Sequence, residues 1–200
     1  ESKANKKVSP MPAIKSVVPF WTEDFTNGIP TNWQNSAAPW VYRGPATSPG
    51  INTGSQGAYG TNSGAINSPT ASTGFMIFDS DYYDNNGIQG NFGGGLYPTP
   101  HNGDLKTDMI DLSGYPDVMI KMNSYFRTFM GQAFINFYIN GTYTSQVEVH
   151  TDLNVNDSSP KDAVLMVRMP TFVPGNANVQ IEFQFEGSTN NASGFSGYYF

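Results

Sequence analysis

Carboxylate and amide side chains crowd one short stretch of the chain: Asp79, Asp81, Asp84, Asn85 and Asn86. Gly87 closes this stretch. Calcium binds six to eight oxygen ligands at flexible spacing, and such side chains supply them. The spacing departs from that of an EF-hand loop. Asp and Asn also favour turns because their side chains bond to nearby backbone. The stretch therefore predicts either a calcium site or a polar turn.

Paired carboxylates occur once on a regular element. Glu182 and Glu186 share one side of an alternating segment, but at strand rise they lie roughly 13 Å apart. That separation exceeds the one that glycosidases use, so a solvated sheet face is the favoured interpretation. His101 and His150 have no triad or zinc-protease motif around them. We therefore expect no catalysis by this segment.

Aromatic side chains are frequent at 14%. Several fall in expected loops or on the wetter side of expected strands, and four are candidate stacking residues for a ligand: Trp33, Trp40, Tyr125 and Tyr138. The alternative is that a protein without disulfides uses such rings as core plugs and edge covers. Both interpretations stay open at this point.

The elements that must position these groups are strands. In 117–127, one side carries Val118, Ile120, Met122, Ser124 and Phe126. Alternation of this kind predicts a strand with one buried face. Residues 132–139 and 142–149 predict a hairpin at Asn140-Gly141, because both residues tolerate positive φ. A two-residue turn would place the apolar residues of the two strands on opposite faces, so we expect a β-bulge.

Further apolar strands are expected at 40–42, 74–78, 163–169 and 179–186, with a short edge strand around Ala58-Tyr59. No segment of ten residues has a helical period. The pattern predicts an all-β fold, an antiparallel jelly-roll β-sandwich. Residues 1–19 are expected to form a tail or linker and 20–200 the domain. Its last strand is expected to open at 197–200 and to continue past Phe200.

Composition narrows the function classes. A net charge of -6 argues against nucleic acid as a partner. Cys is absent, so neither disulfides nor thiolate metal sites exist. No apolar run approaches the ~20 residues of a membrane span. The abundance of Gly, Pro, Asn, Ser and Thr favours a secreted or cell-surface protein whose signal peptide has been removed.

Two motifs carry a family resemblance. Glu23-Asp24-Phe25 with Gly28-Ile29-Pro30 and Trp33 resembles the opening of jelly-roll modules in secreted Bacteroidetes proteins, the cleaved-adhesin and MAM-like domains. Asp108–Gly114 resembles their "S-P-x-I-D-L-S-G" segment, with Asp108-Met109 in place of Ser-Pro. Gly197–Phe200 is similar to the start of their last strand, without the terminal Asp pair.

The resemblance implies a non-catalytic adhesion or binding module of a larger protein, with a glycan or a surface protein as its partner. It also implies a structural calcium ion, with Glu23 or Asp24 as the sequence-distant partner of the 79–86 stretch. Because this chain lacks the Asp pair that ends the family's last strand, a metal site that uses that pair is not expected here. Two alternatives are an accessory domain of a secreted hydrolase and a structural or cargo module that engages secretion machinery.

Overall fold

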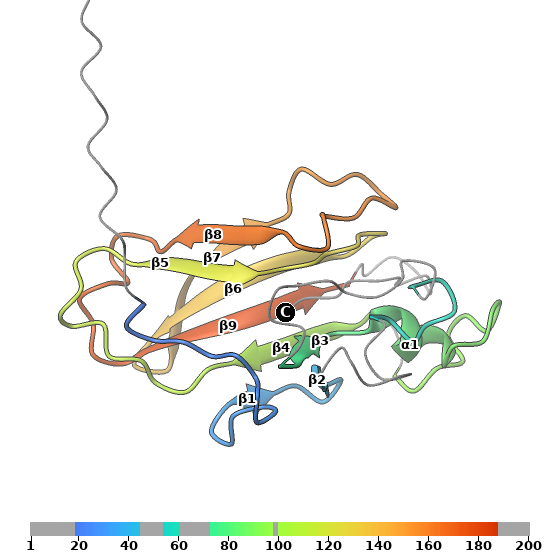
Figure 1. Cartoon of the computed structure of the whole chain (residues 1–200), viewed down its shortest axis with the longest axis horizontal. Coiled ribbons are helices and arrows are strands. Elements are labelled where there is room, and N and C mark those ends of the chain that lie inside the picture. The colour runs from blue at the N-terminus through green and yellow to red at the C-terminus, as the bar shows by residue number, and fades with distance from the viewer. Residues whose placement is uncertain (1–18, 45–53, 61–72, 98–99, 188–200) are drawn as a thin grey trace, which may run out of the picture.

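The computed structural model describes residues 19–44, 54–60, 73–97 and 100–187 (Figure 1). The expected tail, apart from Pro19, and the expected strand at 197–200 lie outside these residues. The strands are β1 (Gln34–Asn35), β2 (Val41–Arg43), β3 (Phe75–Ile77), β4 (Asn102–Lys106), β5 (Met119–Asn123), β6 (Gln132–Ile139), β7 (Thr142–Val149), β8 (Val164–Arg168) and β9 (Val179–Glu186). One short helix is described, α1 (Ser80–Asn85), and it is not long enough to cross a membrane.

The largest sheet, which we call the central sheet, has five strands in the order β1-β4-β9-β6-β7. Every pairing in it is antiparallel. Its central strands β6 and β9, and its edge strand β7, have the bounds that the sequence predicts. Alternation along them separates an apolar face from a polar one. The all-β, antiparallel prediction is confirmed, since the remaining strands also pair antiparallel, as β2-β3 and β5-β8.

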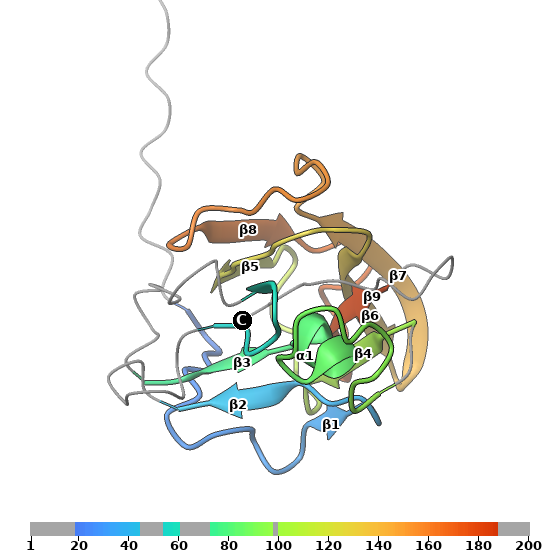
Figure 2. The same ribbon diagram turned by 90° about the vertical axis from the view of Figure 1, so that its right-hand side faces the viewer.

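The core lies against the apolar face of this sheet. Figure 2 shows β2-β3 and β5-β8 on the same side of it. One cluster of buried side chains joins all three sheets, with Met76 from β3, Val167 from β8 and Phe185 from β9. Burying such side chains contributes about 1.5–3 kcal/mol each, so this layer stabilises the sheet that carries the polar face on its other side.

The β6–β7 hairpin contains the predicted bulge. Asn140 and Gly141 form the turn with φ of 51° and 76°. Tyr138 pairs with Tyr143 but Phe137 pairs with Ser145, so Thr144 is the extra residue. The hydroxyl of Thr144 donates to the carbonyl of Phe137 over 2.8 Å. The shift returns Val147 and Val149 to the apolar face, as the sequence requires.

Three segments differ from expectation. The strand expected at 117–127 is shorter, since β5 covers only Met119–Asn123. Ala58 and Tyr59 form a turn rather than an edge strand, because their N–H groups donate to side chains of the α1 segment and not to a neighbouring strand. β4 lies partly in a stretch that reads as glycine-rich loop, and it is a full member of the central sheet. Its register with β9 brings Asp104 and Lys106 beside the glutamates of that strand.

Candidate functional site

The acidic stretch folds into α1 and its two caps. The Asp79 side chain caps the N-terminus by accepting from the Tyr82 N–H, a usual role for Asp. Asn86 ends the helix in the left-handed conformation, with φ of 53°. In this structure the stretch is thus a capped helical turn, within which Asp81 and Asp84 are fully buried.

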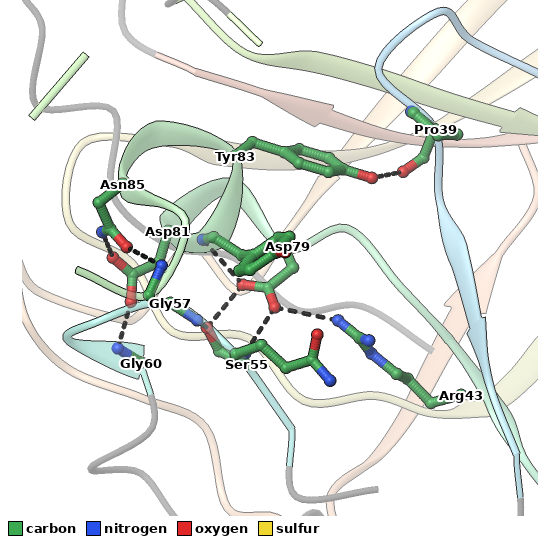
Figure 3. A network of polar contacts seen from close by, with 12 residues as sticks. Pro39, Arg43, Ser55, Gly57, Gly60, Asp79, Asp81, Tyr83 and Asn85 are labelled. Carbon is green, nitrogen blue, oxygen red and sulfur yellow. Dashed lines mark hydrogen bonds and ion pairs between the residues drawn. The ribbon is translucent and has the colours of Figure 1, made fainter. Parts of the chain in front are cut away.

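Asp79 is the centre of a buried network (Figure 3). Its carboxylate accepts from the Ser55 hydroxyl at 2.5 Å and from the Gln56 N–H at 2.7 Å. It also forms an ion pair with the Arg43 guanidinium, with N–O at 3.2 Å. Burial raises the pKa of Asp79, while the Ser55 and Gln56 hydrogen bonds and the Arg43 charge oppose that rise. The network ties β2 and the 54–60 segment to the start of the helix.

Asp81 binds the same segment from the first turn of the helix (Figure 3). One carboxylate oxygen accepts from the N–H groups of Tyr59, at 2.8 Å, and of Gly60. The other accepts from the Asn85 amide at 2.6 Å. A Cβ on Gly57 would overlap the Asp81 carboxylate, so the close approach requires glycine there. Asp81 therefore acts in this structure as a cross-link between two segments.

The other predicted calcium ligands are spread out. Asp84 accepts from the Gly93 N–H at 2.8 Å through one oxygen, and no described residue donates to its other, buried oxygen. Asn86 donates to Gly94, and the exposed Asp24 accepts from the Thr26 N–H at 2.9 Å.

Within the described ranges, no three acidic or histidine side chains are grouped as a metal site requires. N–H and O–H donors occupy both oxygens of Asp79 and of Asp81, so these two residues do not fit a calcium shell as they lie. Calcium at this stretch stays a prediction, with a test given below.

The candidate stacking residues fall into two groups. Trp40 and Tyr125 are 1% and 2% exposed and lie in the core, which favours the core-plug interpretation for both. Trp33 is half-buried and stacks between Trp21 and Phe183. Tyr138 is the one of the four that lies on the polar face of the central sheet, where it takes part in a hydrogen-bond network.

Sequence reasoning missed two serine–histidine contacts, because the partners lie far apart in the chain. Ser80 Oγ is 2.7 Å from His101 Nδ1, and Ser124 Oγ is 2.7 Å from His150 Nε2. Both serines are fully buried, so neither hydroxyl is accessible to a substrate. Burial lowers the pKa of both histidines. These contacts join segments of the fold rather than form a catalytic centre.

The strongest candidate for a binding site is the face of the central sheet that points away from the core. Strand register places these side chains on it: Asn102, Asp104, Lys106, Gln132, Phe134, Asn136, Tyr138, Tyr143, Gln146, Glu148, Gln180, Glu182, Gln184 and Glu186. We call this set the polar sheet face. The turn places Tyr143 opposite Tyr138, and the bulge then brings Gln146 opposite Asn136, so both residues of β7 lie on this face.

Glu182 organises the centre of the polar sheet face. One carboxylate oxygen accepts from the Asn136 amide and from the Tyr138 hydroxyl, each at 2.9 Å. The other lies 3.6 Å from the Lys106 ammonium, which also stands 4.2 Å from the centre of the Tyr138 ring. Glu182 is 5% exposed, so it is not the solvated side chain that its alternation predicts. Its partners on the two neighbouring strands, β4 and β6, compensate for that burial.

The network continues toward β4. The Asn136 amide also donates to Gln184 Oε1 at 3.1 Å, and the Gln184 amide donates to Asp104 at 2.9 Å. The pKa of Asp104 is raised, chiefly by burial, with Glu182 and Glu186 adding to the rise. Burial and the hydrogen bond to Glu182 raise the pKa of Tyr138, so its hydroxyl stays protonated as a donor.

One atom of this network lacks a partner. Asn136 is 3% exposed, and no described residue donates to its Oδ1. A buried acceptor without a donor costs about 1–3 kcal/mol. The hydrogen bonds of its amide nitrogen to Glu182 and Gln184 fix the orientation of the side chain. Unsatisfied polar groups of this kind are uncommon in folded proteins, and a functional role is one explanation for them.

Comparison with known proteins gives no assignment. No family model matches the chain, and no curated protein matches it.

Proposed function

We propose that the chain is a non-catalytic binding module of a secreted or cell-surface protein, of jelly-roll type, and that it binds a glycan on the polar sheet face. The observation that supports this most is the network around Glu182, in which side chains from three neighbouring strands hold one another in place. Ligand sites combine a few well-placed polar groups with aromatic surface, and this face has both.

Preorganisation favours recognition by this surface. The polar groups come from paired strands rather than from loops, so little side-chain freedom is lost on binding. Tyr143 is 49% exposed, and its ring meets that of Tyr138 edge-to-face with centroids 5.8 Å apart. Tyr143 therefore offers an apolar ring surface to a sugar beside a row of amide and carboxylate groups.

The binding experiment is a glycan array followed by titration calorimetry on the best ligand. Tyr143→Ala should weaken binding by about two- to tenfold, since aromatic contacts contribute about 0.5–1.5 kcal/mol. Phe172→Ala is the matched control, because Phe172 is similarly exposed at 54% and lies outside the polar sheet face. Equal losses in both variants, or no glycan binding at all, would argue against this function.

Two alternatives make different predictions. As an accessory domain of a secreted hydrolase, the module would bind the polysaccharide that its parent protein cleaves. As a structural or cargo module, it would bind secretion machinery and leave every glycan unbound. A surface protein as the ligand would give binding to intact cells that survives enzymatic removal of their glycans.

A further inference from the structure

We propose that the polar sheet face selects a saccharide with ammonium groups, an oligomer of glucosamine, over neutral and anionic saccharides. This inference rests on the proposed function and adds the chemical class of the ligand. Three observations lead to it: the charge of the face, the use of its donors, and the contact that one ammonium already makes there.

The face is acidic. Its carboxylates are Asp104, Glu148, Glu182 and Glu186, and Lys106 is its one cation. Glu148 and Glu186 are exposed and flank Gln132 at one end of the sheet. A surface with this excess of negative charge attracts cations and repels uronates and sulfated sugars.

Most donors at the centre of the face are already used. The amides of Asn136 and Gln184, the Tyr138 hydroxyl and the Gln132 amide all donate to acceptors within the face. Lys106 pairs with Glu182 and stands over the Tyr138 ring, so much of its charge is balanced within the face. What remains toward a ligand at the centre of the face is chiefly acceptor capacity.

The accessible acceptors are the exposed carboxylates of Glu148 and Glu186, and the unpartnered Oδ1 of Asn136 is a further acceptor that lies buried within the face. An ammonium group carries three donors and no acceptor, and it suits such a surface better than a hydroxyl does. Hydrogen bonds that involve charged partners are also about twice as strong as neutral ones.

The rings of Tyr138 and Tyr143 give the third observation that favours an ammonium ligand. The Lys106 ammonium stands 4.2 Å from the centroid of the Tyr138 ring, a distance typical of cation–π contacts. This contact shows that the face accommodates an ammonium against a ring. Tyr143 meets Tyr138 edge-to-face and is half exposed, so its ring is available to a ligand ammonium in the same manner.

The test compares three oligosaccharides of equal length on the full chain: glucosamine, N-acetylglucosamine and galacturonate oligomers. The glucosamine oligomer should bind at least about tenfold more tightly than its N-acetylated form, and its affinity should fall as salt rises. The galacturonate oligomer should bind most weakly. Melting curves of each variant show whether it is folded.

Substitutions locate the effect. The double variant Glu148→Gln, Glu186→Gln should lose at least about threefold in affinity for the glucosamine oligomer while keeping its affinity for the N-acetylated one. Asp162→Asn removes an exposed charge outside the face and should change neither affinity.

Equal or tighter binding of the N-acetylated or galacturonate oligomer would overturn this inference and leave the proposed function intact. If none of the three binds and the glycan array is also blank, the proposed function itself is refuted.

Discussion

Replacing Arg43 with Met should unfold the region around α1 at a much lower temperature. Arg43 and Asp79 form an ion pair whose side chains are 10% and 1% exposed. Met keeps most of the apolar stem but leaves the Asp79 carboxylate buried without its cation. Removing one partner of a buried pair costs about 3–5 kcal/mol. The remaining donors to Asp79, Ser55 and Gln56, place the expected loss at the lower end, about 3 kcal/mol.

For a chain of this length, each kcal/mol lowers the melting temperature by about 2–4 °C, so the shift should be about 6–12 °C at pH 7. Differential scanning calorimetry measures it. Arg168→Met is the matched control, because it breaks the exposed ion pair with Asp117 and should leave the melting temperature nearly unchanged.

The loss should also depend on pH. Burial raises the pKa of Asp79, and removing Arg43 removes one of the influences that oppose this rise. The folded variant then takes up a proton at a higher pH than the unfolded chain does. Lowering the pH from 7 toward 4 therefore favours the folded variant, and its deficit against the native chain should shrink. A variant that melts like the native chain at pH 7, or a deficit independent of pH, would refute this reasoning.

Three further predictions concern other parts of the fold. Burial lowers the pKa of His101 below its usual value near 6.5, so the unfolded chain takes up the proton first. The stability advantage of the native chain over His101→Gln, followed by urea unfolding, should therefore shrink as pH falls from 7.5 to 5.5, and a constant difference would contradict this. Gly141 has φ of 76° with open space around it, so Gly141→Ala should destabilise by about 1 kcal/mol, whereas Gly114→Ala, also in open space but without positive φ, should be neutral or slightly stabilising. If calcium binds the 79–86 stretch, the native chain should melt higher in calcium than in chelator, and Asp81→Ala should abolish that difference. Equal melting of the native chain in both would refute the calcium site, and an equal loss in both for Asp81→Ala would be explained by its hydrogen bonds to Tyr59 and Gly60.

The sequence predicts best where alternation is long. β6, β7 and β9 each run for 8 residues, and their bounds follow from the period of two alone. Even the bulge is predictable. Without it, a two-residue turn would place the apolar residues of 132–139 and 142–149 on opposite faces of the sheet. Local pattern is sufficient in these strands because each turns one face toward the core along most of its length.

Prediction fails where tertiary contacts decide. β4 carries Gly103 at an inward position, which reads as loop, but the glycine is there because the Phe78 ring lies against the strand. α1 has only 6 residues, too few to be stable alone. Its buried carboxylates acquire partners from residues 43 and 55–60 only once the chain has folded.

Single residues of the polar sheet face could be predicted from the sequence, but their contacts with one another could not. Tyr138 and Glu182 each stand out by type and alternation, but their contact depends on the register between β6 and β9. A strand pattern places a residue on a face and does not tell which residue of another strand lies beside it. The burial of Glu182 follows from that register, and so does the position of Asn136 between Glu182 and Gln184.

The bulge at Thr144 decides which face of the sheet the side chains of β7 point to. The two-residue turn alone would place Val147 and Val149 on the polar face, and the extra residue returns them to the apolar face. Deleting Thr144 alone, or one turn residue alone, would remove the need for a bulge and leave Val147 and Val149 on the apolar face. Deleting both would turn Val147 and Val149 outward and Gln146 and Glu148 inward. This hairpin should therefore tolerate the loss of one residue, which the bulge absorbs, better than the loss of two.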